Sequence, residues 1–217
     1  MSYFFNLEGD VNDLDSLKQT TLCNLCESDS NLLIIKKLVE YGAQVNFNGL
    51  CGSDTANYPI LLASHYGCTN IVKFLLKNGA YPEVKDHDEM NCFLHAQASQ
   101  NLETIKLTCS LCDLNVSSSR GLAPIDFIFH HFNSESDAIE VFDYLVSLGV
   151  KMNTYSRDCK HPSLFREFYE KMPKLALKYC EWEETVACRL DVGIIDLADY
   201  DVYDLYNKTK EKQQLNE

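Results

Sequence analysis

Two pairs of cysteines have the spacing of zinc ligands. Cys23 and Cys26 form one C-x-x-C motif, and Cys109 and Cys112 form the other. Two such motifs predict a zinc site when about 15–20 residues separate them. Here more than eighty residues intervene, so the pairs could share an ion only if the fold brought them together. Because the N-terminus has acidic residues and no basic leader, we expect reduced thiols of a cytosolic protein rather than disulfides.

Histidines are the other residues that could do chemistry, as metal ligands, bases or contact residues. The six are His65, His87, His95, His130, His131 and His161. No serine or cysteine has a sequence setting that supplies a base and a group to orient that base. A glycine-rich phosphate loop is missing too, because Gly49 and Gly52 do not stand between a strand and a helix. We therefore expect no catalytic site, no cofactor and no bound metal.

The segment Tyr58–Val84 predicts two short antiparallel helices. Pro59 suits a first helical turn, where the missing N–H has no intrahelical partner to lose. The first helix ends near Gly67, and Gly79 follows the second as a left-handed cap, a conformation that costs a residue with a Cβ roughly 1–2 kcal/mol. The expected apolar faces are Ile60, Leu62 and Ala63 in the first helix, and Ile71, Val72, Phe74, Leu75 and Leu76 in the second.

This pattern resembles the ankyrin repeat family, whose consensus runs TPLHLAAxxGHxEIVKLLLExGADVNA. Tyr58–Val84 follows that consensus without a gap. The matching positions are Pro59, Ala63, Gly67, Ile71, Val72, Lys73, Leu75, Leu76, Gly79 and Ala80. The resemblance implies an all-α solenoid of helix-turn-helix repeats, which stack because no repeat can bury its apolar face alone.

Weaker copies of the pattern flank this segment. We expect four to five ankyrin-like repeats within residues 20–180, at about 20–47, 58–84, 91–115, 121–154 and 161–180. Irregular capping ends complete the expected organisation, with residues 1–19 as an N-terminal cap and residues 181–217 as an acidic cap or tail. The segment that connects successive repeats, called the finger, is four residues longer between Asn46 and Tyr58, and a longer helix-to-helix turn is expected at Asn133–Asp137.

The expected stacking assigns roles to several polar residues. It places the two cysteine pairs about 20 Å apart, since neighbouring helices pack about 8–10 Å apart. Zinc–sulfur bonds are only about 2.3 Å long, so we expect the cysteines to fill the core. His95 is expected inside a helix, hydrogen-bonded to a neighbouring repeat's loop. Asn46 and Asn153 resemble ankyrin asparagines that are hydroxylated in some organisms, but we expect them mainly to hydrogen-bond across the finger turn.

The resemblance implies a non-enzymatic protein-binding module. The variable positions of the family lie at the finger tips and late in the first helices, on one concave face. The residues that we expect to contact a partner are Asn48, Leu50, Asp54, His65, Tyr66, His87, Glu89, Ser99, Arg120, His130, His131, Arg157 and Lys160. Tyr66 is the best single anchor, because aromatic residues dominate interface hot spots.

The formal net charge is −13, and the segment from Glu181 onward contains ten acidic and four basic residues. Such a field repels phosphate backbones, which disfavours nucleic-acid binding, and it favours a partner with a basic surface, although the acidity could also serve solubility alone. No long apolar run predicts a membrane span. We expect a cytoplasmic monomer, with a nuclear location left open. The alternative is an adaptor or regulator, such as a pathogen's host-directed protein, whose acidic C-terminal segment recruits ubiquitin-ligase machinery.

Overall fold

A computed structural model describes residues 10–16, 19–46, 58–150 and 171–190. The chain divides into two compact parts, Met1–Ser119 and Arg120–Glu217. We call them the N-terminal part and the C-terminal part. Among the described residues, helices and turns dominate, and the only β-type pairing is an isolated bridge between Leu14 and Thr20. The described chain is therefore all-α, as the sequence predicts.

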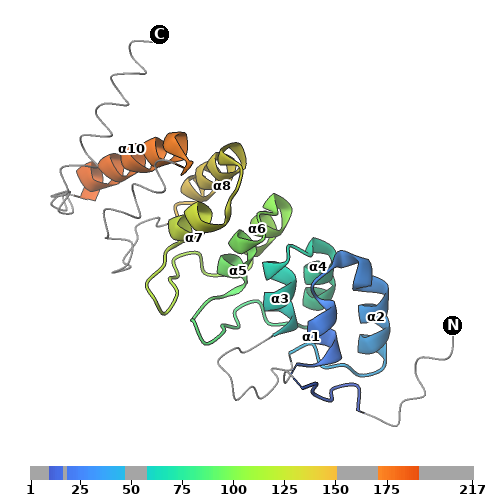
Figure 1. Cartoon of the computed structure of the whole chain (residues 1–217). Helices are drawn as coiled ribbons and strands as arrows, with labels where there is room; N and C mark the ends of the chain where they lie inside the picture. Colours follow the sequence, from blue (N-terminus) through green and yellow to red (C-terminus); the bar gives the residue numbers. More distant parts are fainter. Residues whose placement is uncertain (1–9, 17–18, 47–57, 151–170, 191–217) are drawn as a thin grey trace. The chain divides into compact units, whose positions relative to one another are not determined.

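The N-terminal part contains three pairs of short helices (Figure 1). In chain order the elements are α1 (Thr21–Leu25), the 3-10 helix η1 (Asp29–Asn31), α2 (Leu32–Glu40), α3 (Pro59–His65), α4 (Thr69–Lys77), α5 (Cys92–Ala98) and α6 (Leu102–Cys109). The first helices of the pairs lie side by side, because α3 contacts both α1 and α5. The second helices α4 and α6 also contact each other.

The middle pair has the boundaries that its sequence predicts. Pro59 is the first residue of α3. Gly67 and Gly79 have φ angles of 68° and 84°, in the left-handed region that favours glycine. Gly67 is also required by packing, because a Cβ there would lie 2.9 Å from the Cβ of Asn101 and 3.1 Å from that of Ser99. Gly67 therefore both turns the chain and lets the third pair approach.

An apolar core runs between the helix pairs. Ala63, Ile71 and Leu75 are fully buried in it, and Leu22 and Ile35 from the first pair belong to the same cluster. Burying a side chain of this size contributes about 1.5–3 kcal/mol relative to leaving it exposed. Because Ala63 has no exposed surface, a larger residue there would overpack the joint between pairs.

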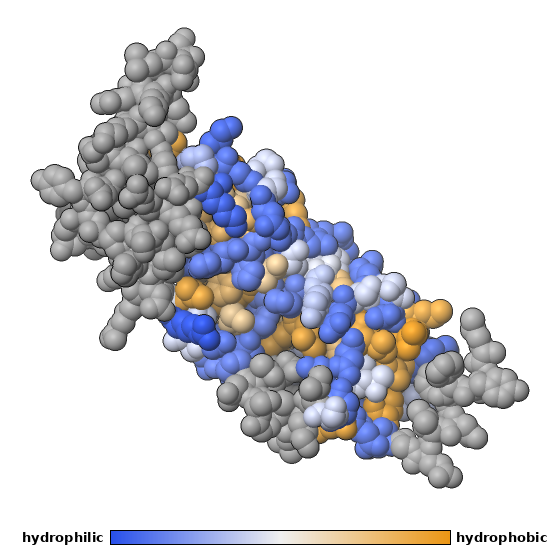
Figure 2. Space-filling view, viewed as in Figure 1, coloured by the Kyte–Doolittle hydropathy of each residue, from blue (hydrophilic) through white to orange (hydrophobic). Residues whose placement is uncertain are grey.

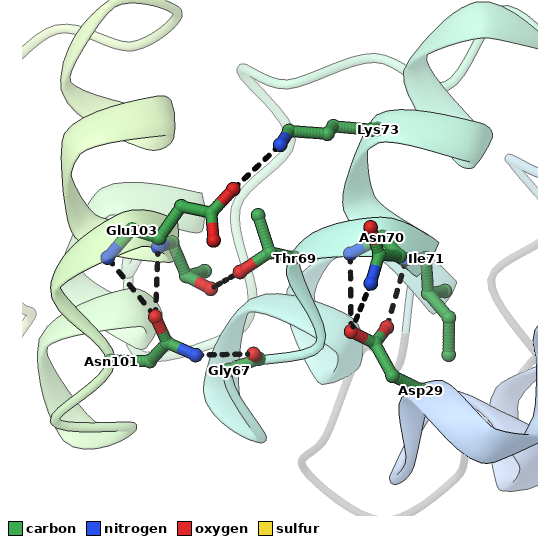
Figure 3. A network of polar contacts seen from close by, with 9 residues as sticks. Asp29, Gly67, Thr69, Asn70, Ile71, Lys73, Asn101 and Glu103 are labelled. Carbon is green, nitrogen blue, oxygen red and sulfur yellow. Dashed lines mark hydrogen bonds and ion pairs between the residues drawn. The ribbon is translucent and has the colours of Figure 1, made fainter.

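Polar contacts join the first pair to the second at the start of α4 (Figure 3). Asp29 in η1 accepts hydrogen bonds from the backbone N–H groups of Asn70, at 3.3 Å, and Ile71, at 3.0 Å. The side-chain amide of Asn70 donates to the same carboxylate at 3.0 Å. The first N–H groups of a helix have no intrahelical acceptor. A carboxylate from the preceding pair therefore completes α4.

A second set of contacts joins the second pair to the third. Asn101 caps α6 by accepting the N–H groups of Glu103 and Thr104, and its amide donates to the carbonyl oxygen of Gly67 at 3.0 Å. The hydroxyl oxygens of Thr69 and Thr104 lie 2.6 Å apart in the same buried joint. Losing an asparagine cap typically costs about 1 kcal/mol. The cap of one helix is thus also a tie to its neighbour.

Asn46 joins the end of the first helix pair to the end of the second. Its amide donates to the carbonyl oxygen of Gly79 at 2.8 Å, and its side-chain oxygen accepts the N–H of Tyr81 at 2.9 Å. These bonds run to the next pair, and the expected bond across Asn46's own finger stays a prediction, because residues 47–57 lie outside the described residues. Asn153 lies outside the described residues.

The segment ahead of α1 repeats these contacts. Asn12 donates to the carbonyl oxygen of Gly42 at 3.2 Å and accepts the N–H of Gln44 at 2.8 Å, as Asn46 does one pair later. Asn12 also precedes Thr20 by eight residues, the finger spacing of the repeat. Residues 10–16 and 19–20, in the stretch expected to cap the N-terminal end, therefore have finger geometry.

Two fingers share one pair of hydrogen bonds. In the finger ahead of α5, the N–H of Asp86 donates to the carbonyl oxygen of Met90, and the Asp86 carboxylate accepts the N–H of Met90. In the segment ahead of α1, Asp15 and Gln19 exchange the same two bonds. An aspartate that bonds backbone amides a few residues ahead is a common device for closing a turn.

The C-terminal part contains α7 (Pro124–His131), α8 (Glu135–Ser147) and α10 (Pro173–Leu190). The prediction of a long turn at Asn133–Asp137 is wrong, because α8 already begins at Glu135. Ser134 caps α8 by accepting the N–H of Asp137. The additional residues therefore lengthen the second helix instead of the turn.

The start of α10 is held by α8. One oxygen of Glu135 accepts the backbone N–H groups of Lys174, at 2.6 Å, and Leu175, at 3.3 Å. Further along, Lys178 lies 2.6 Å from the carboxylate of Asp143. Glu135 thus does for α10 what Asp29 does for α4. The helix α10 also runs through residue 180, where the sequence analysis places the end of the repeats.

Candidate protein-binding surface

In the middle pair, the first helix, α3, ends in two exposed aromatic side chains. His65 is the last residue of α3, and Tyr66 is its C-cap, with 49% of its surface exposed. Their rings meet edge to face, with centroids 5.2 Å apart. The ring of His65 also lies edge to face with that of His95, at 5.8 Å. The two predicted contact residues of α3 are therefore brought together with a side chain from α5.

His95 connects this ring cluster to the finger. Its Nε2 lies 2.8 Å from Oδ2 of Asp86, and only 14% and 8% of the two side chains are exposed. The other oxygen of Asp86 accepts the N–H groups of Asp88 and Met90. The prediction that His95 lies inside a helix is confirmed. Its partner is not a neighbouring repeat's loop, as expected, but the finger that leads into its own helix.

The charge of Asp86 is stabilised where it lies. Burial raises the pKa of its carboxyl group, but the hydrogen bonds from His95 and from the backbone of Met90 and Asp88 outweigh burial. The pKa of Asp86 therefore lies below its ordinary value. A carboxylate accepts and does not donate, so His95 donates through Nε2. We call Asp86, His95, His65 and Tyr66 the finger cluster.

The tip of the finger carries the predicted contact residues His87 and Glu89, both exposed. Glu89 has a φ of 60°, which few residues with a side chain adopt. Lys85 pairs with Glu89 at 3.2 Å. Ser119 fixes Asp88 with two hydrogen bonds. Its N–H donates to the carbonyl oxygen of Asp88 at 2.7 Å, and its hydroxyl donates to the Asp88 carboxylate at 3.0 Å. Charged groups are thus displayed on a backbone that several hydrogen bonds fix.

Ser99, another predicted contact residue, bonds within its own turn, and its contact with a partner stays a prediction. Its hydroxyl donates to the carbonyl oxygen of Ala96 at 2.6 Å and accepts the N–H of Asn101 at 3.1 Å. Its Cβ also lies against Gly67. Half-buried in this way, Ser99 supports the turn between α5 and α6.

In the C-terminal part, His130 and His131 end α7 and are both exposed. The ring of His131 stacks on Phe127, with centroids 6.0 Å apart. Burial lowers the pKa of His131, and the nearby charges of His130 and Lys171 lower it further. Arg120 is exposed at the start of this part. The remaining predicted contact residues, Asn48, Leu50, Asp54, Arg157 and Lys160, lie outside the described residues.

Sequence reasoning missed Asp86 as a site residue and placed His95 with the structural ones. An aspartate a few residues ahead of the repeat's first helical turn is the signal that could have identified the pair. Asp86 closes the finger by bonding backbone amides, and its second oxygen remains available for a histidine on the following helix.

Six cysteines of the N-terminal part are free thiols. The free thiols are Cys23, Cys26, Cys68, Cys92, Cys109 and Cys112, and all except the half-buried Cys112 are buried. Burial raises the pKa of Cys26, and raises that of Cys109 to about 12. The expected core-filling role is therefore confirmed for Cys23, Cys26 and Cys109. No group of three or more metal-ligating side chains lies together in the described ranges. Within those same ranges, no helix is both long and apolar enough to cross a bilayer.

Part of this chain is similar in sequence to known proteins. The family model described as Ankyrin repeat matches residues 57–87, which hold α3, α4 and the finger as far as His87. A curated relative, Ankyrin repeat and KH domain-containing protein mask-1 of Caenorhabditis elegans, is 29% identical over 109 residues. The chain therefore contains an ankyrin-type repeat at residues 57–87. The similarity covers 50% of this chain and 4% of that much longer relative. Ankyrin repeats generally act as non-enzymatic modules that bind other proteins.

Proposed function

We propose that this protein is a non-enzymatic module that binds one partner protein through a concave surface of finger tips and first-helix ends. The finger cluster is the observation that carries the proposal. It displays an exposed tyrosine and histidine beside a charged finger, and the buried bond between His95 and Asp86 ties the finger to α5. A surface ordered before binding loses little conformational entropy on binding.

The proposal includes a solenoid of four to five ankyrin-like repeats. Repeated ties support it, because Asn12 and Asn46 make equivalent bonds to successive pairs. In both parts, an acidic side chain near the start of one second helix accepts backbone N–H groups at the start of the next second helix. Asp29, in η1 ahead of α2, does so in the N-terminal part, and Glu135 does so in the C-terminal part. By this comparison α10 takes the place of the second helix of a fifth repeat.

The partner that fits best has a basic surface, because the chain carries a net charge of −13. The same charge makes nucleic acid a poor partner. We further propose that the protein acts as a monomer in the cytoplasm, without a cofactor and away from membranes.

The experiment compares affinity capture by the wild-type chain and by Tyr66→Ala and His131→Ala variants, followed by calorimetry with the protein captured. Loss of an aromatic hot spot is expected to weaken binding by about 2 kcal/mol or more. Tyr81→Ala is the matched control, since Tyr81 is 64% exposed but follows the second helix of the pair instead of ending the first. Unchanged affinity for both test variants would place the site elsewhere.

A second candidate function rests on the acidic C-terminal segment. From Glu181 to the last residue of the sequence, ten acidic residues stand against four basic ones. This charge suits an adaptor that recruits another factor, such as ubiquitin-ligase machinery. Deleting Asp196–Glu217 tests this role. A stable protein that retains its first partner but loses another supports the adaptor, and a protein that retains every partner contradicts it.

A further inference from the structure

A groove of about 430 Å³ lies between the second helices α2 and α4. Leu32 and Lys36 line it from α2, and Lys73, Phe74 and Lys77 line it from α4. It is thus formed by second helices, whereas the finger cluster is formed by the ends of first helices and a finger. The groove therefore offers the protein a second surface.

The groove is basic on a strongly acidic chain. Lys36 and Lys77 make no ion pair within the described ranges. Lys73 pairs with Glu103 at 2.7 Å, but both side chains are more than half exposed, and such pairs contribute little. The three lysines make the groove locally positive, although the net charge of the chain is −13.

Apolar surface accompanies these charges. Leu32 and Phe74 are half-buried in the groove wall. Elsewhere on α2, Leu33 is 70% exposed and Ile34 is 48% exposed. Figure 2 shows hydrophobic surface over the region of α1 and α2. Exposed apolar side chains that gather next to a polar rim are typical of interaction sites.

We propose that this groove binds an acidic amphipathic helix of another protein. Carboxylates on such a helix would pair with Lys36, Lys73 and Lys77, and its apolar side would cover Leu32 and Phe74. The wall from Asn70 to Asn78 is about 12 Å long at 1.5 Å per residue, which matches roughly two helical turns. Because Lys73 and Lys77 are four residues apart, they face carboxylates spaced by one turn.

The probe is a synthetic peptide of about 14 residues, roughly 21 Å long as a helix, with glutamates one turn apart and leucines on the adjoining face. Fluorescence anisotropy measures its binding to the full chain. Lys77→Glu is expected to weaken binding about fivefold or more. Lys85→Glu, which changes the net charge equally but lies on the finger, is the matched control and is expected to change affinity less than about twofold. Glu103→Gln frees Lys73 and is expected to tighten binding.

Three results would overturn the proposal. One is equal weakening by Lys77→Glu and Lys85→Glu, which would mean that only overall charge matters. Another is equal binding of a peptide with the same composition in scrambled order, since that peptide lacks an amphipathic face. The third is a dimer of the chain that Lys77→Glu dissociates, because a second copy would then occupy the groove.

Discussion

The second and third helix pairs have the same fold but reach it with different residues. At the turn between helices, the second pair has Gly67, with a φ of 68°, and the third pair has Gln100, with a φ of 57°. At the start of the first helix, Pro59 follows an uncapped position, whereas Asn91 accepts two backbone N–H groups of α5. The third pair therefore replaces favourable backbone residues with explicit hydrogen bonds.

The two pairs also differ in what they bury. Ile71 and Leu75 face the core in α4, and the equivalent positions in α6 are Thr104 and Thr108, which are fully buried as well. The hydroxyl of Thr108 donates to carbonyl oxygens within its own helix. A buried hydroxyl with a partner is tolerated, but it adds less than an apolar side chain of similar size. The third pair thus relies more on polar joints.

Gln97 is a buried polar residue of the third pair whose side chain has no hydrogen-bond partner in the described chain. Ser64 in α3 donates to the carbonyl oxygen of Ile60. Gln97 holds the equivalent place in α5 and is fully buried, yet neither its amide nitrogen nor its oxygen has a hydrogen-bond partner in the described chain. The fold therefore tolerates departures from the repeat pattern when neighbouring contacts offset their cost.

The largest effect is expected from shortening Leu75. Leu75→Ala should lower the free energy of unfolding by about 2–5 kcal/mol, because it removes buried apolar surface and leaves a cavity. Thr108→Ala at the equivalent place should cost only about 1–2 kcal/mol. Urea unfolding followed by circular dichroism measures both. Equal costs would contradict the idea that the second pair supplies more apolar stabilisation.

Exchanging the turn residues should give effects of opposite sign. Gly67→Ala is expected to cost about 2 kcal/mol or more, because the left-handed conformation disfavours a Cβ and that Cβ would collide with Asn101. Gln100→Gly should instead stabilise the fold by roughly 0.5 kcal/mol. It relieves the strain of the left-handed backbone, and the greater conformational entropy that glycine loses on folding offsets part of that gain. Thermal and urea unfolding of both variants check the signs. A destabilised Gln100→Gly would mean that its side chain matters more than its backbone.

Replacing Gln97 should stabilise the third pair. Gln97→Met has a similar shape and removes the buried amide, so the free energy of unfolding should rise by about 1–3 kcal/mol. Ser64→Ala is the matched change at a satisfied position and should be neutral or slightly destabilising. Chemical unfolding compares the two variants. A loss of stability in Gln97→Met would indicate that the amide is stabilised in solution.

The smallest expected effect concerns pH. The pKa of Asp86 is lowered in the folded chain, so its carboxylate stabilises the fold at pH above its unfolded pKa of about 3.9. That contribution is lost as the pH falls through the lower folded pKa. The stability difference between the wild type and Asp86→Asn should therefore be present near pH 6 and shrink below about pH 4. A difference that does not vary with pH contradicts this role of the carboxylate.

Much of the fold could be predicted because turn and apolar residues act locally. Pro59, Gly67 and Gly79 indicate the limits of α3 and α4, and the structure has those limits. The turn expected at Asn133–Asp137 was wrong, since Ser134 can cap a helix early and the spacing alone does not reveal whether extra residues lengthen a turn or a helix. Of the candidate site, His65 and Tyr66 were predicted together, but their link to Asp86 through His95 was not.

By itself, the sequence determined the all-α class and the ankyrin-type repeat at residues 57–87, because a repeat's pattern of small, apolar and turn residues is set by contacts within and next to each helix pair. Only the tertiary structure decided which distant polar groups meet. The bonds of Asn12, Asn46 and Asp29 join residues some thirty to forty positions apart, and the groove between α2 and α4 depends on how two helices pack. Such contacts arise from the stacking of whole pairs, and no local pattern of residue types encodes them.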